Sequence, residues 1–222
     1  RYITTVNSAT VLSSSEIRLT PNISSRRGAA VAMELIDFES SFEFQFESFL
    51  GNRNSGGDGM AIVFHDDDRG FNAIGSGVGC LVATNIQNGI MLDLDTHPDS
   101  GFPQDHGAIR RIGIGNAPGT LSPRIALPNL ENGSYHPVVV SWNADSQTLE
   151  YTIDGMLAGS YTGDLITNYF NGSSLVYLAF TAGTGGRRNE HRIRFSSYCS
   201  LPFFVDVDGD GLSNHLDLDS DG

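Results

Sequence analysis

The stretch "FEFQFES", residues 42–48, decides the fold class of this chain. Its three phenylalanines alternate with polar side chains, which places the rings on one face of a strand and the polar groups on the other. The same period of two returns at residues 149–154 and around Ile193. Asp154 and Gly155 form a dipeptide typical of a hairpin turn. These segments predict strands with one buried face.

Other apolar runs are continuous, at residues 60–64 ("MAIVF"), 138–142 ("VVVSW") and 175–180 ("LVYLAF"). They predict strands that are covered on both faces. No segment of ten or more residues has a convincing helical period, and clusters of Gly, Asn, Asp, Ser and Pro separate the runs. We therefore predict an all-β protein, an antiparallel β-sandwich or jelly roll, with one domain over residues 1–201.

Charge and composition exclude two classes of partner. The chain has a formal net charge of −13, and phosphate binding needs a basic surface, so we expect no nucleic-acid partner. No apolar run approaches the roughly 20 residues that cross a bilayer, so we expect no membrane insertion. Cys80 and Cys199 have no zinc or redox spacing, and the choice between a disulfide and two buried thiols stays open.

The acidic segment at residues 202–222 predicts calcium binding. It contains the pattern D-x-D-x-D-G-x5-D, in which alternate carboxylates converge on one hard cation and a backbone carbonyl adds a ligand. A second pattern, D-x-D-x-D-G, begins at Asp217, the last residue of the first. The alternative is a solvated acidic tail. The expected ligands are Asp206, Asp208, Asp210, the carbonyl of Leu212, and Asp217.

Overlapping loops of this kind resemble thrombospondin type 3 repeats, which wrap calcium ions in extracellular connectors. The resemblance covers the final seventeen residues. It implies a longer, secreted or surface-anchored polypeptide with further domains. Because such weak sites need extracellular calcium, we expect an extracellular or cell-surface location.

A second acidic cluster, "DLDTHPDSGFPQDH" at residues 93–106, follows an apolar lead-in. Asp93 and Asp95 share one face of the expected strand, about 6 to 7 Å apart at the backbone. Buried carboxylates need partners, and oxygen ligands favour Ca²⁺. An imidazole at His106 suits Mn²⁺ or a similar ion beside it. The cluster therefore predicts one or two divalent cations.

Two alternatives to a metal site stay open. Asp93 and Asp95 can be solvent-facing residues of an edge strand. The stretch "DLDTH" also partly echoes the E-x-D-x-E strand of laminarinase-type sandwich hydrolases, whose paired carboxyl groups cleave glycosidic bonds. His97 stands where that strand has its third carboxylate. A glycoside hydrolase is therefore the less favoured alternative.

Residues 1–200 resemble L-type (legume-like) lectins, particularly their bacterial and adhesin-borne relatives. Five motifs carry the resemblance in the right order: "GGDGMAIVFH" (56–65), "IGSGVGC" (74–80), "IMLDLDTHPD" (90–99), "DHGAI" (105–109) and "AFTAGTGGRRNEHRI" (179–193). The family implies a concanavalin-like sandwich that binds sugar without catalysis.

The resemblance also implies roles for individual residues. Asp58, after a cis peptide bond, would accept hydrogen bonds from two sugar hydroxyls, and a backbone N–H at Gly77 would donate one. His97 stands where the family often stacks an aromatic ring on the sugar. The remaining implied sugar-site residues are Asp99 and the specificity-loop residues Thr184, Gly185 and Gly186.

Two metal sites follow from the same resemblance. The implied calcium ligands are Asp95, Asp99, Asp105 and the carbonyl of His97. A second ion, Mn²⁺ or Ca²⁺, would take Asp93, Asp95, Asp105 and His106.

This chain departs from the family at two of these positions. Asp93 replaces a glutamate, and Asp99 replaces an asparagine that gives an N–H to the sugar, which an ionised aspartate cannot do. We expect a calcium-dependent, glycan-binding module of an extracellular adhesin. The alternative is a structural spacer or protein-interaction domain of the same fold without sugar binding.

Overall fold

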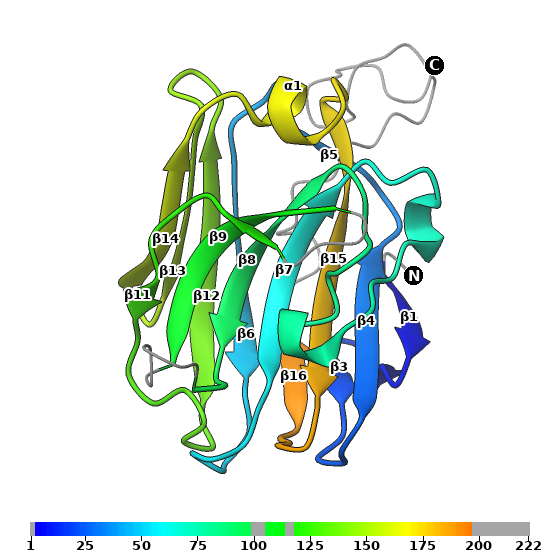
Figure 1. Cartoon of the computed structure of the whole chain (residues 1–222), viewed down its shortest axis with the longest axis vertical. Coiled ribbons are helices and arrows are strands. Elements are labelled where there is room, and N and C mark those ends of the chain that lie inside the picture. Colours follow the sequence, from blue (N-terminus) through cyan, green and yellow to red (C-terminus); the bar gives the residue numbers. More distant parts are fainter. Residues whose placement is uncertain (1–2, 99–104, 114–117, 197–222) are drawn as a thin grey trace.

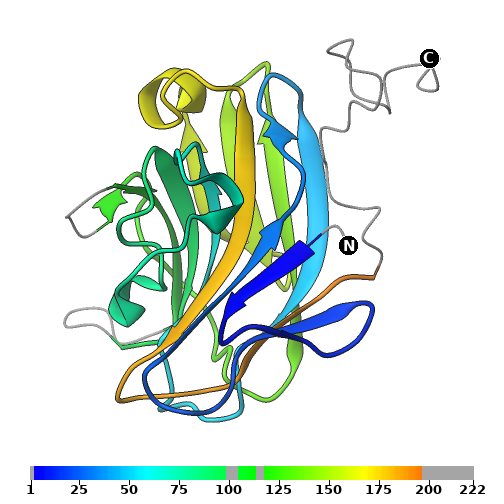
Figure 2. The ribbon, with the colours of Figure 1, turned by 90° about the vertical axis from the view of Figure 1, so that its right-hand side faces the viewer.

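The alternating stretch lies in β6 (Phe42–Phe49), inside one of two antiparallel sheets. Phe44 and Phe46 are buried, whereas Glu43 and Gln45 are exposed, so the predicted half-buried strand is confirmed. The computed structural model describes residues 3–98, 105–113 and 118–196. Figures 1 and 2 show these residues as a two-layer β-sandwich.

The sheet that contains β6 has seven strands, and its inner face forms one side of the core. In β12 the apolar side chains alternate, with Val138 and Val140 buried and Val139 half-buried. The prediction that this run is covered on both faces is wrong, because the outer face of β12 is partly open to water. In sheet order the strands are β14 (Met156–Thr162), β13 (Thr148–Ile153), β12 (Tyr135–Asn143), β6, β16 (His191–Arg194), β3 (Glu16–Thr20) and β2 (Thr10–Val11).

The hairpin predicted at Asp154 and Gly155 joins β13 to β14. Both residues have positive φ angles, 51° and 75°. This backbone conformation matches the twist of two paired antiparallel strands. The prediction of a tight turn at this dipeptide is confirmed.

The second sheet has nine strands and carries the motifs of the acidic cluster. Its neighbouring strands all pair antiparallel. In sheet order they are β1 (Ile3–Asn7), β4 (Arg26–Ala32), β15 (Leu175–Thr184), β7 (Gly59–His65), β8 (Gly89–Asp95), β9 (His106–Ile112) and β10 (Gly119–Thr120), with β11 (Ile125–Ala126) paired to β9 and β5 (Ile36–Asp37) paired to β15.

Aromatic rings join the two layers. The ring of Phe46 meets that of Phe180 from the other sheet edge-on at 5.0 Å between centroids, and Phe44 meets Phe64 at 6.5 Å. Such edge-to-face pairs add to the free energy gained from burying apolar surface. The main core is therefore the space between the sheets.

A second apolar cluster covers the outer face of the nine-stranded sheet. Leu81 and Ile86, from the segment between β7 and β8, are buried with Val63 and Met91 of those strands. This covering explains why every residue of β7 is buried. The prediction that residues 60–64 form a strand covered on both faces is confirmed.

Helical structure in the described residues is limited to short turns. The α-helix α1 (Leu165–Tyr169) has five residues, and the 3-10 turns η1 (Gly70–Asn72) and η2 (Val78–Cys80) have three each. Across the described part of the chain, no helix has the length and apolar character that crossing a membrane requires. Helix α1 precedes β15 and marks one end of the sandwich (Figure 1).

Several predictions fall outside the described residues. These are the boundary near residue 201, Asp99, Cys199 and the predicted calcium ligands of the acidic segment: Asp206, Asp208, Asp210, Leu212 and Asp217.

Candidate functional site

Asp58 lies at the start of β7, at the end of the sandwich opposite α1 (Figure 1). The peptide bond between Gly57 and Asp58 is cis, as the family resemblance implies. The Asp58 backbone is held on both sides, because its N–H donates to the Gly183 carbonyl at 3.0 Å and its carbonyl accepts from the Thr96 N–H at 3.1 Å. Strand β15 and the residue that follows β8 therefore fix the position of the Asp58 backbone.

Asp58 is 5% exposed. Burial raises the pKa of its carboxyl group, and the nearby charges of His97 and Arg187 partly oppose that rise. Within residues 3–98, 105–113 and 118–196, neither carboxylate oxygen accepts a hydrogen bond from the protein. The two oxygens are therefore available to donors from a ligand.

Glycines bring two loops close to this carboxylate. A Cβ atom at Gly185 would lie 3.3 Å from Asp58 Oδ2 and 3.6 Å from the Cγ2 of Val78, the residue that follows Gly77. At Gly57 a Cβ would lie 3.6 Å from His97 Cδ2 and 3.4 Å from Arg187 Cβ. The structure thus brings the predicted residue Gly185 next to Asp58, and His97 and Arg187 next to the preceding Gly57. Val78, the neighbour of the predicted residue Gly77, borders Gly185.

Two residues of the predicted specificity loop are placed differently from each other. Gly186 is exposed, and a Cβ there would meet no atom within 4 Å. Thr184 is buried, and its hydroxyl donates to the Ile23 carbonyl at 2.6 Å and accepts from the Arg26 N–H at 2.9 Å. The Thr184 side chain anchors the end of β15, whereas Gly186 lies at the rim.

A buried polar pair that the sequence analysis missed supports the loop before Asp58. Asn189 is fully buried, and its Nδ2 donates to the Arg53 carbonyl at 3.0 Å and to the Glu131 carboxylate. A Cβ at Gly56 would lie 2.1 Å from this Nδ2, so only glycine leaves room for the amide. Asn189 therefore holds residues 51–57, which lead into the cis peptide bond.

Glu131 is 2% exposed and shares this environment. Burial raises the pKa of its carboxyl group to about 7, and repulsion from Asp105 adds to the rise, while the hydrogen bond from Asn189 opposes it. The local sequence does not indicate that Glu131 is buried near the site, because its neighbours in space come from distant segments of the chain.

Asp95 lies directly opposite His106 in the pairing of β8 with β9. Its Oδ1 accepts a hydrogen bond from the His97 N–H at 2.9 Å, and its Oδ2 is 3.8 Å from His106 Nε2. Asp95 is 7% exposed. A buried carboxylate at the end of a strand, followed two residues later by the backbone carbonyl of His97, offers oxygen donors of the kind that a hard cation prefers.

Asp93 has a protein cation beside it. The Nε of Arg110 lies 2.7 Å from Asp93 Oδ2, and Asp93 is 1% exposed. The Tyr151 hydroxyl donates to the Asp93 carbonyl at 2.6 Å from the opposite sheet. Arg110 was not among the predicted site residues, and its guanidinium neutralises the carboxylate that had been expected to bind a second ion.

Asp105 contacts residues of the following loop. Its Oδ2 accepts from the Leu130 N–H at 2.7 Å, and it lies close enough to Glu131 to raise the pKa of that group. Within the described residues no group of three or more His, Cys, Asp or Glu side chains could hold a metal ion. The expected calcium set includes Asp99, which lies outside those residues, so the calcium site stays a prediction.

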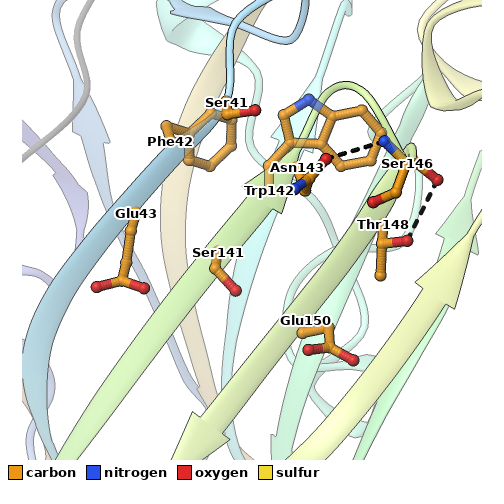
Figure 3. A pocket seen from close by; sticks show the side chains of 9 residues that line it. All are labelled: Ser41, Phe42, Glu43, Ser141, Trp142, Asn143, Ser146, Thr148 and Glu150. Carbon is orange, nitrogen blue, oxygen red and sulfur yellow. Dashed lines mark hydrogen bonds between the residues drawn. The ribbon is translucent and has the colours of Figure 1, made fainter.

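A hollow of about 560 Å³ lies on the other sheet, at the end of the sandwich far from Asp58. Figure 3 shows its lining by side chains of β6, β12 and β13, among them Glu43, Ser141 and Glu150. The Trp142 Nε1 donates to the Phe38 carbonyl at 2.9 Å, and the indole belongs to the core. The hollow shares no residue with the Asp58 site.

The fold is that of a lectin-type β-sandwich. The family model described as the legume lectin beta-barrel domain, of the L-type lectin class, matches residues 1–197. The chain belongs to the L-type lectin family.

Curated relatives are much longer than this chain. The pesticidal crystal protein Cry22Aa of Bacillus thuringiensis is 33% identical over 146 residues, which are 65% of this chain and 19% of that protein. The serine-rich adhesin for platelets of Staphylococcus aureus (strain MRSA252) is 24% identical over 229 residues, which cover 89% of this chain and 16% of the adhesin. The chain thus spans less than a fifth of either relative.

Solved lectins share the fold. The winged bean acidic lectin complexed with methyl-alpha-D-galactose superposes with a TM-score of 0.69 at 18% identity, over 87% of this chain and 90% of the lectin. The exoplasmic/lumenal domain of VIP36, in its Ca²⁺/Man3GlcNAc-bound form, gives 0.63 at 16% identity, over 87% of this chain and 81% of that domain. At these identities the likeness shows the fold.

Proposed function

We propose that this chain binds carbohydrate without catalysis, at the site centred on Asp58. The observation that carries the proposal is the Asp58 carboxylate, which lies beside Gly185 on a residue whose main-chain N–H and carbonyl are both hydrogen-bonded to neighbouring backbone. Sugar hydroxyls are donors that such a carboxylate accepts, and hydrogen bonds to charged groups are stronger than neutral ones. Because the site is rigid before the ligand arrives, binding loses less ordering entropy.

We further propose that calcium supports the site. Its ligands would be Asp95, the His97 carbonyl, Asp99 and Asp105. The ion would neutralise the acidic cluster and fix the backbone after β8. That backbone contains the Thr96 N–H, which donates to the Asp58 carbonyl, and His97, which borders the site. Loss of the ion would therefore loosen one wall of the sugar site.

The setting that we propose is a module of an extracellular or cell-surface protein, with glycans as partners. The likeness to a staphylococcal adhesin and the calcium-binding pattern of residues 202–222 support it. In that setting the segment after the sandwich would be a calcium-stiffened connector of the thrombospondin type 3 kind.

The direct test is a glycan array probed with and without EDTA, using Asp58→Asn and, as the control, Asp68→Asn. Asp68 is exposed in the loop after β7. Losing one charged hydrogen bond, worth about 1.5 to 3 kcal/mol, predicts at least a tenfold weaker affinity for Asp58→Asn. The control should bind like the natural chain.

Other outcomes of the array identify the alternatives. No calcium-dependent ligand would contradict the proposal and favour a spacer or protein-interaction domain of the same fold. Release of reducing ends from a β-glucan, abolished by Asp93→Asn, would favour the hydrolase.

A further inference from the structure

We propose that the guanidinium of Arg110 takes the place of a second divalent ion, so that the cluster between β8 and β9 holds at most one metal ion. The family resemblance implied a second ion at Asp93, Asp95, Asp105 and His106. The observed surroundings of these residues do not fit that ion. This inference concerns metal loading alone and does not depend on whether a sugar binds.

The pairing of β8 with β9 creates the ion pair. Met91 lies opposite Arg110, and Asp93 lies opposite Ala108. Asp93 and Arg110 are therefore diagonal neighbours on one face of the sheet, within reach of a long side chain. The Arg110 Nε is 2.7 Å from Asp93 Oδ2, a distance typical of a charge-assisted hydrogen bond.

Burial makes this pair a poor site for a further cation. The Asp93 side chain is 1% exposed and that of Arg110 is 15% exposed. A divalent ion at Asp93 would lie next to the guanidinium, where charges of the same sign repel strongly because little water screens them. Moving the guanidinium away would leave a partly buried cation without its partner, which is also unfavourable.

The other expected ligands are divided between two places. The Asp105 carboxylate accepts the Leu130 N–H at 2.7 Å. His106 Nε2 faces Asp95 at 3.8 Å. Asp95 is the member of this set that lies beside the His97 backbone. A single ion held there with the His97 carbonyl would not use His106 Nε2, whereas a second ion would need His106 and a share of both Asp95 and Asp105.

The chain offers a matched control in the next residue. Arg111 follows Arg110 on β9 and is exposed. Since successive side chains of a strand point to opposite faces, removing Arg111 alters the net charge equally without freeing Asp93.

The test uses ¹¹³Cd²⁺ as a probe that accepts both oxygen and imidazole ligands. The full chain, labelled with ¹⁵N-histidine, is saturated with the ion, and bound cadmium per chain is counted by equilibrium dialysis. We expect no ¹¹³Cd–¹⁵N coupling to His106 Nε2 in the natural chain or in Arg111→Met. Arg110→Met should gain that coupling and one additional ion per chain.

The results that would overturn the proposal are equally direct. Coupling between cadmium and His106 Nε2 in the natural chain would show that a second ion binds beside Arg110, and this measurement needs no variant. A folded Arg110→Met that gains neither coupling nor an ion would show that Arg110 does not exclude the metal. Neither result bears on glycan binding, which the array tests separately.

Discussion

The buried imidazole of His191 makes the free energy of unfolding of the sandwich depend on pH. The residue lies in β16 and is fully buried, and its Nδ1 is 2.6 Å from the Thr20 Oγ1. Burial lowers the pKa of its imidazole to about 3, from an unfolded value of 6.5. Below pH 6.5 the unfolded chain therefore binds a proton that the folded chain does not bind, and the free energy of unfolding falls as the pH falls.

The magnitude follows from these two pKa values. At pH 7.5 the difference in proton binding is worth less than about 0.1 kcal/mol, and at pH 5.0 it is worth about 2 kcal/mol. Other groups also titrate in this range. Burial lowers the pKa of His65 to about 4 and adds a loss in the same direction. The raised pKa of Glu131, about 7, acts in the opposite direction, because the folded chain binds that proton first as the pH falls.

Comparison with His191→Gln isolates the contribution of His191. Urea unfolding followed by the fluorescence of Trp142, the single tryptophan, gives the free energy of unfolding at both pH values. The drop from pH 7.5 to pH 5.0 should be about 2 kcal/mol smaller in the variant than in the natural chain. An equal drop in both proteins would refute the reasoning that His191 is buried in its neutral form.

Three substitutions test the site and the core. Gly185→Ala places a methyl group 3.3 Å from Asp58 Oδ2, so titration calorimetry should show glycan binding weakened at least tenfold while the thermal stability is unchanged. In the control, Gly186→Ala, the methyl group meets no atom within 4 Å, and glycan binding should be normal. Asn189→Ala removes two buried hydrogen bonds, so it should lower the free energy of unfolding by about 1 to 3 kcal/mol and weaken glycan binding. In the control, Asn52→Ala, the replaced side chain is exposed in the loop of residues 51–57, and both the free energy of unfolding and glycan binding should be unchanged. Phe46→Ala should lower the free energy of unfolding by about 3 to 5 kcal/mol in urea; a loss below 1 kcal/mol would contradict its place in the core.

The fold could be predicted from sequence because strand burial repeats every two residues. Residues 42–48 and the Asp154–Gly155 turn depend on local chemistry, and both predictions are confirmed. The covering of residues 138–142 was mispredicted, because a continuous apolar run does not reveal whether another layer lies over its outer face.

The site was only partly predictable. Motif resemblance predicted Asp58, His97 and Gly185 as sugar-site residues. The structure places Gly185 next to Asp58 and His97 next to Gly57, and their sugar-binding roles stay predictions. It did not locate the pairing of Asp93 with Arg110, which depends on the register between β8 and β9. Asn189 was missed for a similar reason, since its partners come from loops far away in the sequence.

The most direct test of the central claim is a crystal structure of the chain grown with Ca²⁺ and a saccharide identified on the array. The account predicts sugar hydroxyls hydrogen-bonded to both Asp58 oxygens, with a calcium ion bound by Asp95 nearby. A saccharide bound elsewhere, such as in the hollow of Figure 3, or a bound sugar with no ion at Asp95, would contradict it.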